Sequence, residues 1–519
     1  MTRKKLPIGI QTFREIREDD CYYVDKTAFA LKLATEGKYY FLSRPRRFGK
    51  SLFLDTLAEL FVGNEVLFQG LYCHDKWDWN RQYPVIRISF AEGVLHTREA
   101  LDKRILDILR INRESLGVDG PQDLDIAGLF GELLRQSHQK YGQRAVVLID
   151  EYDKPILDNI TNPDIARQMR DGLRNLYSVI KGQDAHIRFA FLTGVSKFSK
   201  VSLFSGLNNL QDITVDKRYS AVCGYTEIDV DTVFAPELQG LDRSKIRDWY
   251  NGYNWLGEAV YNPFDLLLLF DTREFKPYWF ETGTPTFLID ILTERLAWLP
   301  ELGRLESDAE LLSTFDIDDM PTEALMFQAG YLTIDREENL GDAYFYRLRF
   351  PNREVYQSLY GRLLRTWTPD AQAEVRNRKS LYRLLQNNDF EGLQNLFTAF
   401  YAGIPHDWYR NNPIVQYEGY YASVFYSYFA ALGLNIILED ATNHGRIDMT
   451  VHFNEQIYLF EFKVVELVPE GKALRQLKDK NYAEKYQAEG VPIHLIGVEF
   501  SKESRTVVGF DIETQGEGA

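Results

Sequence analysis

A short apolar run, an arginine-rich loop and an apolar helical pattern follow one another between residues 38 and 61. Residues 38–43 read KYYFLS, which is typical of a buried strand, and the loop SRPRRFGKS then ends at Gly49, Lys50 and Ser51. Residues 52–61 (LFLDTLAELF) have the apolar spacing of a helix. Strand, loop and helix in this order favour phosphate binding, because helix N-terminal amide groups and the helix dipole stabilise an anion. The segment therefore predicts an α/β domain that binds a nucleoside triphosphate, ATP with Mg²⁺.

The loop matches only the second half of the usual pattern G-x-x-x-x-G-K-[ST]. Gly49 would let the backbone approach the phosphates, Lys50 would reach the β and γ phosphates, and the Ser51 hydroxyl would ligate Mg²⁺. An arginine stands where the first glycine is usual, and a GKS triplet alone is also compatible with a surface turn. Three loop arginines are expected to add cations near the phosphates: Arg44, Arg46 and Arg47.

Acidic residues follow a second apolar strand, and this supports the phosphate site. RAVVLID ends at Asp150 and is followed by Glu151, at the strand end where open α/β sheets bind ligands. Asp150 would hold Mg²⁺ through water, and Glu151 would polarise the attacking water. After the next strand, IRFAFLTG, the hydroxyls of Thr193 and Ser196 are candidates for sensing the γ phosphate. An acidic turn without ligands is the alternative interpretation of the Asp150–Glu151 pair.

Strands alternate with helical patterns over residues 1–225, and this alternation predicts a doubly wound parallel sheet in a P-loop domain. Further strands are expected at 84–90 and 144–150, with helical sequence over about 94–141. Residues 226–367 contain short helices and then a helix with two short strands, which resembles a winged helix. A helical lid is the alternative for this middle region.

The remaining residues, 368–519, are expected to hold a helical linker and a second α/β domain. The polar stretch 368–380 is the best linker candidate, and the final TQGEGA is expected to be a disordered tail. In between, a helix from about 418 precedes three strands, a helix over 471–487 and a strand ending at 500.

Charged residues interrupt two of these apolar strands. RIDMTVHF carries the carboxylate of Asp448, and IYLFEFKVV carries Glu461 and Lys463, which lie two apart and so share a face. A short turn at Asn454 would make a hairpin that brings Asp448 beside Glu461. Charges on a buried strand cost several kcal/mol unless they are paired or bind a metal. The pattern therefore predicts a site, although most isolated E-x-K triplets are solvated strand edges.

These residue types suit phosphodiester hydrolysis. Asp448 and Glu461 would hold one or two Mg²⁺ ions through hard oxygen ligands, and the metal would activate water. Lys463 would orient that water or neutralise developing negative charge. Glu418, on the preceding helix, is expected to be a further metal ligand, and Gln476, on the following helix, would reach the same pocket.

Several stretches resemble known families. SRPRRFGKSLFLDTL, VVLIDEYDKP, FLTGVSKFSKVSLFSGLNNLQDIT, YVDKT, YNGYNW and YWFETGTPTFL resemble the bacterial AAA-ATPase-like family over about residues 5–300. That family has the same arginine-rich loop, and its relatives include signalling ATPases that carry effector domains. YASVFYSYFAALGLNIILEDATNHGRIDMTV, EFKV and LRQLKDKNYAEKY resemble the PD-(D/E)XK nuclease superfamily over about residues 415–500. The resemblance implies a restriction-endonuclease-like fold with all four motif positions intact: Asp448, Glu461, Lys463 and Gln476.

Composition limits the partners of the chain. A net charge of −16 argues against coating nucleic acid with the whole surface, although a local basic channel remains compatible with it. Three scattered cysteines fit neither a disulfide framework nor a zinc site, so a reducing cytoplasm is expected. Apolar runs are too short for a membrane span, which needs roughly 18 residues, so no membrane partner is expected.

The leading hypothesis is an ATP-controlled, Mg²⁺-dependent nuclease that acts on DNA or RNA. One alternative is an ATP-switched regulatory module whose nuclease-like domain binds nucleic acid or protein without cutting. Another is a translocating motor that uses this domain as a tether. The choice of nucleic acid and the oligomeric state, a homo-oligomer included, stay open, and Arg218 is one of many possibilities for an arginine finger.

Overall fold

The computed structural model describes most of the chain in two compact units. The described residues are 3–121, 123–197, 209–283, 289, 305–308, 312, 317, 320–341, 343–367, 371–402 and 418–516. Unit 1 comprises Met1–Leu288 with Leu305–Asn352, and unit 2 comprises Ile289–Arg304 with Arg353–Ala519. The helices among the described residues lack the combination of length and apolar character that crossing a bilayer requires.

A five-stranded parallel sheet forms the centre of unit 1. Its strands run in the order β2-β3-β4-β1-β5, so β4 lies between the strands that precede Lys50 and Glu151. The strands are β1 (Tyr39–Ser43), β2 (Val85–Ser89), β3 (Ala145–Asp150), β4 (Ile187–Gly194) and β5 (Gln211–Asp212). Every residue of β1 and β3 is buried, as expected for parallel strands covered on both faces. The predicted doubly wound sheet is confirmed.

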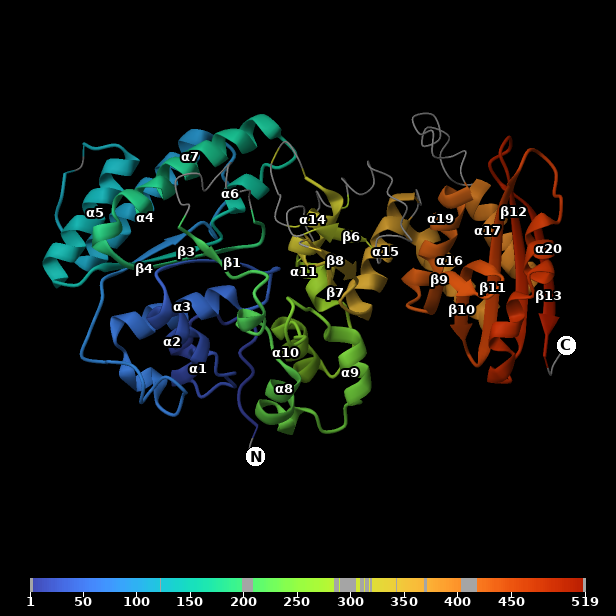
Figure 1. Cartoon of the computed structure of the whole chain (residues 1–519), viewed down its shortest axis with the longest axis horizontal. Helices are drawn as coiled ribbons and strands as arrows, with labels where there is room; N and C mark the ends of the chain where they lie inside the picture. The colour runs from blue at the N-terminus through green and yellow to red at the C-terminus, as the bar shows by residue number, and fades with distance from the viewer. Residues whose placement is uncertain are drawn as a thin grey trace. The chain divides into compact units, whose positions relative to one another are not determined.

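Helices cover both faces of this sheet (Figure 1). One face carries α1 (Phe13–Glu18), α2 (Thr27–Glu36) and α3 (Lys50–Val62), and the other carries α4 (Arg98–Leu116), α5 (Ile126–Tyr141), α6 (Lys154–Leu157) and α7 (Pro163–Gly182). The helical stretch expected over 94–141 is two helices, because Gly117 adopts φ 58° and ends α4. The Asp125 side chain then caps α5 by accepting a hydrogen bond from the Gly128 amide.

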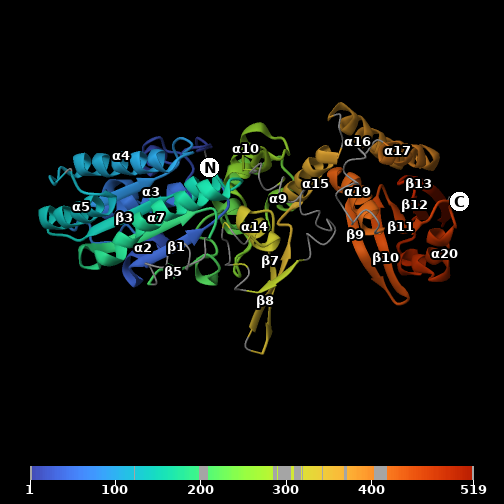
Figure 2. The same ribbon diagram turned by 90° about the horizontal axis from the view of Figure 1, so that it is seen from above.

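The second half of unit 1 is mainly helical, and a β-hairpin follows its last helix. The helices are α8 (Glu227–Val233), α9 (Arg243–Tyr250), α10 (Pro263–Thr272), α11 (Tyr278–Gly283) and α14 (Thr322–Ala329). The hairpin strands β7 (Thr333–Leu340) and β8 (Ala343–Arg349) form a sheet with β6 (Glu306–Asp308), and Figure 2 shows the hairpin projecting from its unit. The predicted helix followed by two strands is confirmed.

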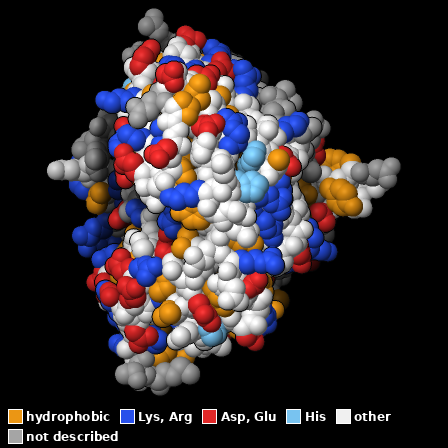
Figure 3. Space-filling model, turned by 90° about the vertical axis from the view of Figure 1, so that its left-hand side faces the viewer, with side chains coloured by type: hydrophobic (Ala, Val, Ile, Leu, Met, Phe, Trp, Pro, Cys, Tyr) orange, Lys and Arg blue, Asp and Glu red, His pale blue; other side chains and the backbone are white. Residues whose placement is uncertain are grey.

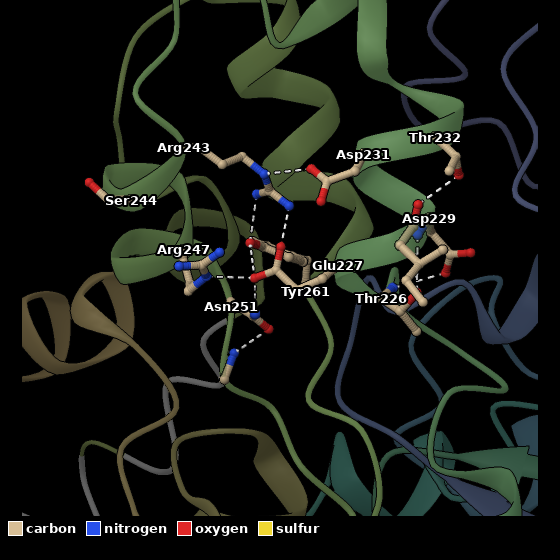
Figure 4. Close-up of polar contacts among 12 residues, drawn as sticks. Thr226, Glu227, Asp229, Asp231, Thr232, Arg243, Ser244, Arg247, Asn251 and Tyr261 are labelled. Carbon is tan, nitrogen blue, oxygen red and sulfur yellow. Dashed lines mark hydrogen bonds and ion pairs between the residues drawn. The ribbon is translucent and has the colours of Figure 1, made fainter.

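A polar network joins α8 and α9 to the chain segment 251–261 (Figure 4). Glu227 accepts hydrogen bonds from Arg247 at 2.7 Å, Tyr261 at 2.9 Å and Asn251 at 3.1 Å. Arg243 donates to Tyr261 at 2.7 Å and to Asp231 at 2.8 Å. The network fixes the position of segment 251–261, which carries the aromatic residues that contact the phosphate loop.

Unit 2 holds a second five-stranded sheet, in the order β13-β12-β11-β10-β9. Only the β11–β12 pair is parallel among its ladders. The strands are β9 (Asn435–Thr442), β10 (Gly445–Phe453), β11 (Gln456–Val465), β12 (Ile493–Ser501) and β13 (Val507–Gln515). The accompanying helices are α15 (Arg353–Trp367), α16 (Ala371–Gln386), α17 (Phe390–Ala402), α19 (Glu418–Ala431) and α20 (Lys472–Asp479).

Helices pack on both faces of this sheet. Phe425 of α19 contacts Phe460 and Phe462 of β11 at ring-centroid distances of 5.4 and 5.2 Å. On the other face, Leu477 of α20 packs in a core cluster with Leu459 of β11. Because side chains alternate along a strand, Glu461 and Lys463 point to the α20 face. The restriction-endonuclease-like α/β fold predicted for this part of the chain is confirmed.

Three predictions of local structure were wrong. Most of the expected linker 368–380 is helical, because residues 371–386 form α16 and bury Leu381 and Leu385 one turn apart. The expected tail begins in a strand, since Thr514 and Gln515 pair with β12 in the β13 ladder. The helix expected over 471–487 ends at Asp479, because Asn481 adopts φ 47° and a 3-10 helix follows. The domain limits 225 and 367 stay predictions.

Candidate functional site

A cavity of about 480 Å³ opens beside the start of α3 in unit 1. Its polar wall includes Gly49, Lys50, Ser51 and Glu151. Its other walls come from three parts of the chain that bring apolar side chains: residues 7–11, residues 22–24 and the residues near Tyr225 and Phe264. The volume falls in the usual range of ligand pockets, about 300–1,000 Å³. The cavity therefore offers a polar end at the phosphate loop and an apolar remainder.

The loop backbone and Lys50 are held by local contacts. Gly49 adopts φ 89°, a left-handed conformation that glycine reaches without strain, and α3 begins at the next residue. Lys50 is only 7% exposed and donates hydrogen bonds to the carbonyls of Arg44 and Pro45, each at 2.9 Å. Burial lowers the pKa of Lys50, and the charge of nearby Asp150 partly opposes this effect.

Arg44 lies elsewhere than expected. Its side chain is 1% exposed, and its guanidinium donates to the carbonyls of Ser43, Thr214 and Tyr219 at 2.9, 2.8 and 3.2 Å. The guanidinium also stacks 3.9 Å from the ring centroid of Trp255. Burial lowers the pKa of Arg44 to about 10. The expectation that Arg44 adds a cation at the phosphates is corrected, because carbonyls and an aromatic ring hold the guanidinium inside the protein.

The other two loop arginines lie at the cavity. Arg46 and Arg47 both line it, and the guanidinium of Arg47 is 4.7 Å from the ring centroid of Phe264. Arg218 forms an ion pair with Asp216 at 2.6 Å, and its side chain is half exposed. The cations that line the cavity with Lys50 are thus Arg46, Arg47 and two lysines, Lys26 and Lys154.

Asp150 and Glu151 lie at the end of β3. Glu151 lines the cavity and adopts φ 50°, and its backbone amide donates to the Asp150 carboxylate at 3.0 Å. Burial raises the pKa of Glu151, and the neighbouring Asp150 raises it further. Asp150 is buried and its charge acts on Lys50. Ser51 lines the same cavity, so the loop and the strand end bring a hydroxyl and a carboxylate to one space.

The Thr193 hydroxyl is turned into the sheet, and Ser196 is buried in the loop after β4. The Thr193 hydroxyl donates to the Leu42 carbonyl of β1 at 2.9 Å, and Thr193 is fully buried. The Ser196 backbone amide donates to the Asp153 carboxylate at 2.6 Å. The expectation that the Thr193 hydroxyl faces a phosphate is corrected, because the parallel pairing with β1 places it against a backbone carbonyl.

Asp153 is a residue of this site that the sequence reasoning missed. It is buried, lines the cavity, and accepts hydrogen bonds from the Val195 and Ser196 amides. Burial raises its pKa to about 6, although the Ser196 hydrogen bond acts in the opposite direction. The signal was available in the run Asp-Glu-Tyr-Asp, since a second carboxylate follows Glu151 by two residues. Asp153 joins the end of β3 to the loop after β4.

In unit 2, the structure brings Glu461, Lys463 and Gln476 into contact. Glu461 is fully buried on β11, and its Oε1 accepts a hydrogen bond from Lys463 Nζ at 3.0 Å. The same oxygen accepts from the Gln476 amide of α20. A buried carboxylate is tolerated when it is paired and hydrogen-bonded, as it is here.

Asp448 lies beside this group at the end of the β10–β11 ladder. The regular pairing ends at Met449 and Phe460, and beyond it the Asp448 carboxylate accepts from the Phe462 amide at 2.8 Å. The two-residue turn at Asn454 and Glu455, with φ 52° and 57°, sets this register. The expected hairpin is present, and it places Asp448 against the backbone of the residue that separates Glu461 from Lys463.

Tyr482 lies close to the same charges. Burial raises the pKa of Tyr482, and the charge of Glu461 raises it further. The 3-10 helix after α20 brings its ring to this position. The Tyr482 hydroxyl therefore lies at the border of the cluster formed by Asp448, Glu461, Lys463 and Gln476, which we call the carboxylate cluster.

The donor chemistry of the carboxylate cluster fits Mg²⁺. Asp448 and Glu461 offer hard carboxylate oxygens, which Mg²⁺ prefers, and Mg²⁺ commonly keeps several waters beside one or two carboxylates. Within the described part of the chain, no group of three or more His, Cys, Asp or Glu side chains is arranged to hold a metal. Glu418 begins α19, and its side chain lies outside the described residues. Among the residues that the structure describes, Asp448 and Glu461 are the carboxylates that the cluster offers.

Glu499 of β12 is a second residue that the sequence reasoning missed. It is fully buried and accepts hydrogen bonds from the amides of residues 470 to 473, at 2.5 to 3.2 Å. Burial acts to raise the pKa of Glu499, but the four amide hydrogen bonds outweigh it and lower the pKa. The Glu499 carboxylate thus caps the first turn of α20, the helix that carries Gln476.

Charges of both signs are mixed on one face of the molecule (Figure 3). Figure 3 views the molecule from the end at which α5 lies in Figure 1, and acidic side chains lie among the Lys and Arg side chains over this face. This distribution agrees with the net charge of −16. Nucleic-acid binding over this whole face is therefore not favoured.

Comparison with known proteins matches two segments of the chain to described families. Residues 7–204 match a family described as predicted AAA-ATPase, and residues 416–510 match the PD-(D/E)XK nuclease superfamily. A relative from Azotobacter chroococcum mcd 1, named as an uncharacterized protein in the vnfD 5′ region, is 68% identical over 517 residues, which cover 99% of this chain and 100% of the relative. The chain therefore belongs to the family of this relative, the AAA-ATPase-like proteins that carry a PD-(D/E)XK nuclease superfamily domain towards the carboxy terminus.

Proposed function

We propose that this chain binds and hydrolyses ATP in unit 1 and that its nucleotide state controls a Mg²⁺-dependent phosphodiesterase centre in unit 2, which cleaves DNA or RNA. The observation that carries the proposal is the carboxylate cluster. Glu461 is fully buried, and Lys463 and Gln476 both donate to the same oxygen. Burying these charged groups costs desolvation free energy, and apolar side chains would fill the same part of the core without that cost. A catalytic role explains why the charges lie there.

The roles in unit 2 follow from these positions. Bound to Asp448 and Glu461, Mg²⁺ would supply charge stabilisation and an activated water. Lys463 would hold that water or neutralise charge on the phosphate, since its ammonium group already lies 3.0 Å from a Glu461 oxygen. Gln476 would keep Glu461 in position through its amide. Asp448 is held by the Phe462 amide, which keeps its carboxylate beside Glu461.

The roles in unit 1 follow from the cavity beside α3. Lys50 would neutralise the β and γ phosphates, and Arg46 and Arg47 would add charge from the cavity wall. Ser51 and Asp150 would hold Mg²⁺, and Glu151 would orient the attacking water. The raised pKa of Glu151 suits this role, because a more basic carboxylate accepts a proton more readily. The three cysteines, Cys21, Cys73 and Cys223, are free and buried, which fits a reducing cytoplasm.

The test combines nucleotide variants and nuclease variants of the full chain. Single- and double-stranded DNA and RNA are incubated with Mg²⁺ or Mn²⁺, with ATP or without it. Wild type is expected to cleave at least one of them, and Asp448→Ala and Lys463→Ala are each expected to lower the cleavage rate by about 10²-fold or more. If ATP binding is sufficient to permit cleavage, Lys50→Ala is expected not to cleave, while Glu151→Gln stays active or becomes hyperactive in the cleavage assay.

Other outcomes separate the alternatives. Equal cleavage by wild type, Lys50→Ala and Glu151→Gln would show that nucleotide does not control the cluster. Absence of cleavage with intact nucleic-acid or protein binding would favour the regulatory binding module. ATP turnover that rises strongly with nucleic-acid length would favour a translocating motor.

A further inference from the structure

Arg44 occupies the position of the first loop glycine, yet its guanidinium points away from the cavity. It donates to Thr214 and Tyr219, which are 170 and 175 residues away in the sequence, and stacks on Trp255 at 3.9 Å. Arginine suits this position because a planar fork can donate to several carbonyls and stack on an indole at once. The residue that makes the loop unusual therefore connects it to the second half of unit 1.

The next loop residues also contact that half of unit 1. The Trp279 indole N–H donates to the Arg46 carbonyl at 3.0 Å. A Cβ atom added at Gly330 would lie 2.7 Å from Pro45 and 3.2 Å from Trp279, so the end of α14 packs directly on the loop. Gly330 adopts φ 90° and is followed by Tyr331, whose ring centroid is 5.4 Å from that of Trp279.

Phe48 completes the contact. Its ring lies edge-on to those of Tyr253 and Trp255, at centroid distances of 4.7 and 5.6 Å. The Phe48 carbonyl accepts a hydrogen bond from the Gly224 amide at 3.2 Å. Loop residues 44–46 and 48 each have a partner among residues 214–331. We call the three partners Trp255, Trp279 and Gly330 the clasp.

Lys50 connects this contact to the phosphate site. Its ammonium group has three donors, and two are used on the carbonyls of Arg44 and Pro45. These are the two loop residues that touch Trp255 and Gly330. A phosphate that binds the third donor would pull on the ammonium group and so shift its two carbonyl contacts, which anchor the loop segment that packs on the clasp.

We infer that Arg44 and the clasp couple the phosphate loop to α14, so that Arg44 acts as a positioning residue that transmits nucleotide binding instead of contacting phosphate. The inference rests on the proposed nucleotide site. It assigns a role to the arginine at the position of the first loop glycine, which phosphate binding leaves unexplained. It also gives α14, a short helix that ends against the loop, a direct connection to the nucleotide.

The test measures hydrogen–deuterium exchange of the full chain with and without Mg²⁺ and a non-hydrolysable ATP analogue, adenylyl imidodiphosphate. In wild type, the analogue is expected to change exchange about twofold or more in peptides that cover 322–331. Trp279→Phe keeps an aromatic ring but removes the indole N–H donor. Arg44→Lys keeps the positive charge but removes the planar guanidinium. Both variants are expected to bind the analogue within about threefold of wild type and to lose the exchange response at 322–331.

Trp249→Phe is the matched control, because Trp249 packs on Tyr250 and Phe275 in the same half of unit 1. It is expected to respond like wild type. If Arg44→Lys fails to fold, the milder Trp279→Phe carries the test. Analogue binding without an exchange response in wild type, or a full response in both variants, would overturn the coupling while leaving the nucleotide site intact. No analogue binding by wild type in equilibrium dialysis would overturn the nucleotide site, and the coupling with it.

Discussion

Glu499 caps the first turn of α20, and Gln476 in the second turn of that helix donates its side-chain amide to Glu461. Glu499 of β12 thus sets the position of the Gln476 side chain, which reaches Glu461 on β11. Because the cap consists of four hydrogen bonds to one buried carboxylate, the position of Gln476 depends on a charge outside the motif.

Replacing Glu499 by Gln tests this dependence. The amide NH₂ of the variant would face backbone N–H donors, so the free energy of unfolding is expected to fall by about 1–3 kcal/mol. Nuclease activity is expected to fall as well, because α20 and Gln476 shift. Urea unfolding and cleavage assays measure the two effects. Glu513→Gln is the control, since Glu513 forms a partly exposed ion pair with Lys478, and a change under about 1 kcal/mol is expected.

Replacing Lys463 by Ala is expected to lower the cleavage rate by about 10²–10³-fold, because a group that stabilises developing charge is lost. The matched control is Lys502→Ala, which removes an exposed lysine from the same unit and is expected to leave the rate unchanged. Asp448→Asn should in addition weaken Mn²⁺ binding, measured by calorimetry. Unaltered Mn²⁺ affinity in that variant would argue against Asp448 as a metal ligand.

Lys50→Ala and Glu151→Gln are expected to separate binding from hydrolysis. Lys50→Ala removes the ammonium group at the phosphates and should weaken ATP binding. Glu151→Gln keeps the shape of the side chain and should bind ATP with little turnover. Fluorescent-nucleotide titration and phosphate release measure these effects, with Lys76→Ala as an exposed lysine control. Turnover by Glu151→Gln at the wild-type rate would remove Glu151 from the mechanism.

The pH dependence of ATP turnover reports on the same glutamate. Burial and Asp150 raise the pKa of Glu151, and the role proposed for it requires the ionised form. Turnover is therefore expected to fall on the acid side at a pH above the ordinary glutamate pKa of about 4.3. Steady-state rates between about pH 4 and 9 locate this limb. A flat profile down to the ordinary glutamate range would contradict the assignment.

Asp153 should make the stability of the protein depend on pH. Its pKa is raised to about 6, so the folded state binds a proton more tightly than the unfolded state does. The contribution of Asp153 to the free energy of unfolding is therefore most favourable below the pKa of Asp153 in the unfolded chain, about 4. This contribution is lost as the pH rises to about 6. At 1.36 kcal/mol per pKa unit, the loss is about 3 kcal/mol. Asp153→Asn keeps an acceptor oxygen and should remove this slope, which urea unfolding at pH 4 to 7 measures.

Local patterns predicted the elements whose own residues carry a clear apolar run, alternation or turn signal. The buried strands β1 and β3 and the hairpin of β10 and β11 follow from apolar runs, alternation and turn residues. The pairing of Glu461 with Lys463 also follows, because residues two apart on a strand share a face. In α16 and β13 the same reasoning did not succeed, since a polar sequence folds there through packing and ladder contacts with distant segments.

The sequence by itself determined which chemistry the chain can carry: a lysine and a serine after a loop glycine, a carboxylate pair after β3, and a second set of charges on β10 and β11. Only the tertiary structure decided where the side chains point. Arg44 and Thr193 carry groups that suit a phosphate, yet carbonyls of Thr214 and Leu42 hold them in the interior. The reason is physical: a buried donor must find an acceptor, and that acceptor can come from any part of the chain that the fold brings near.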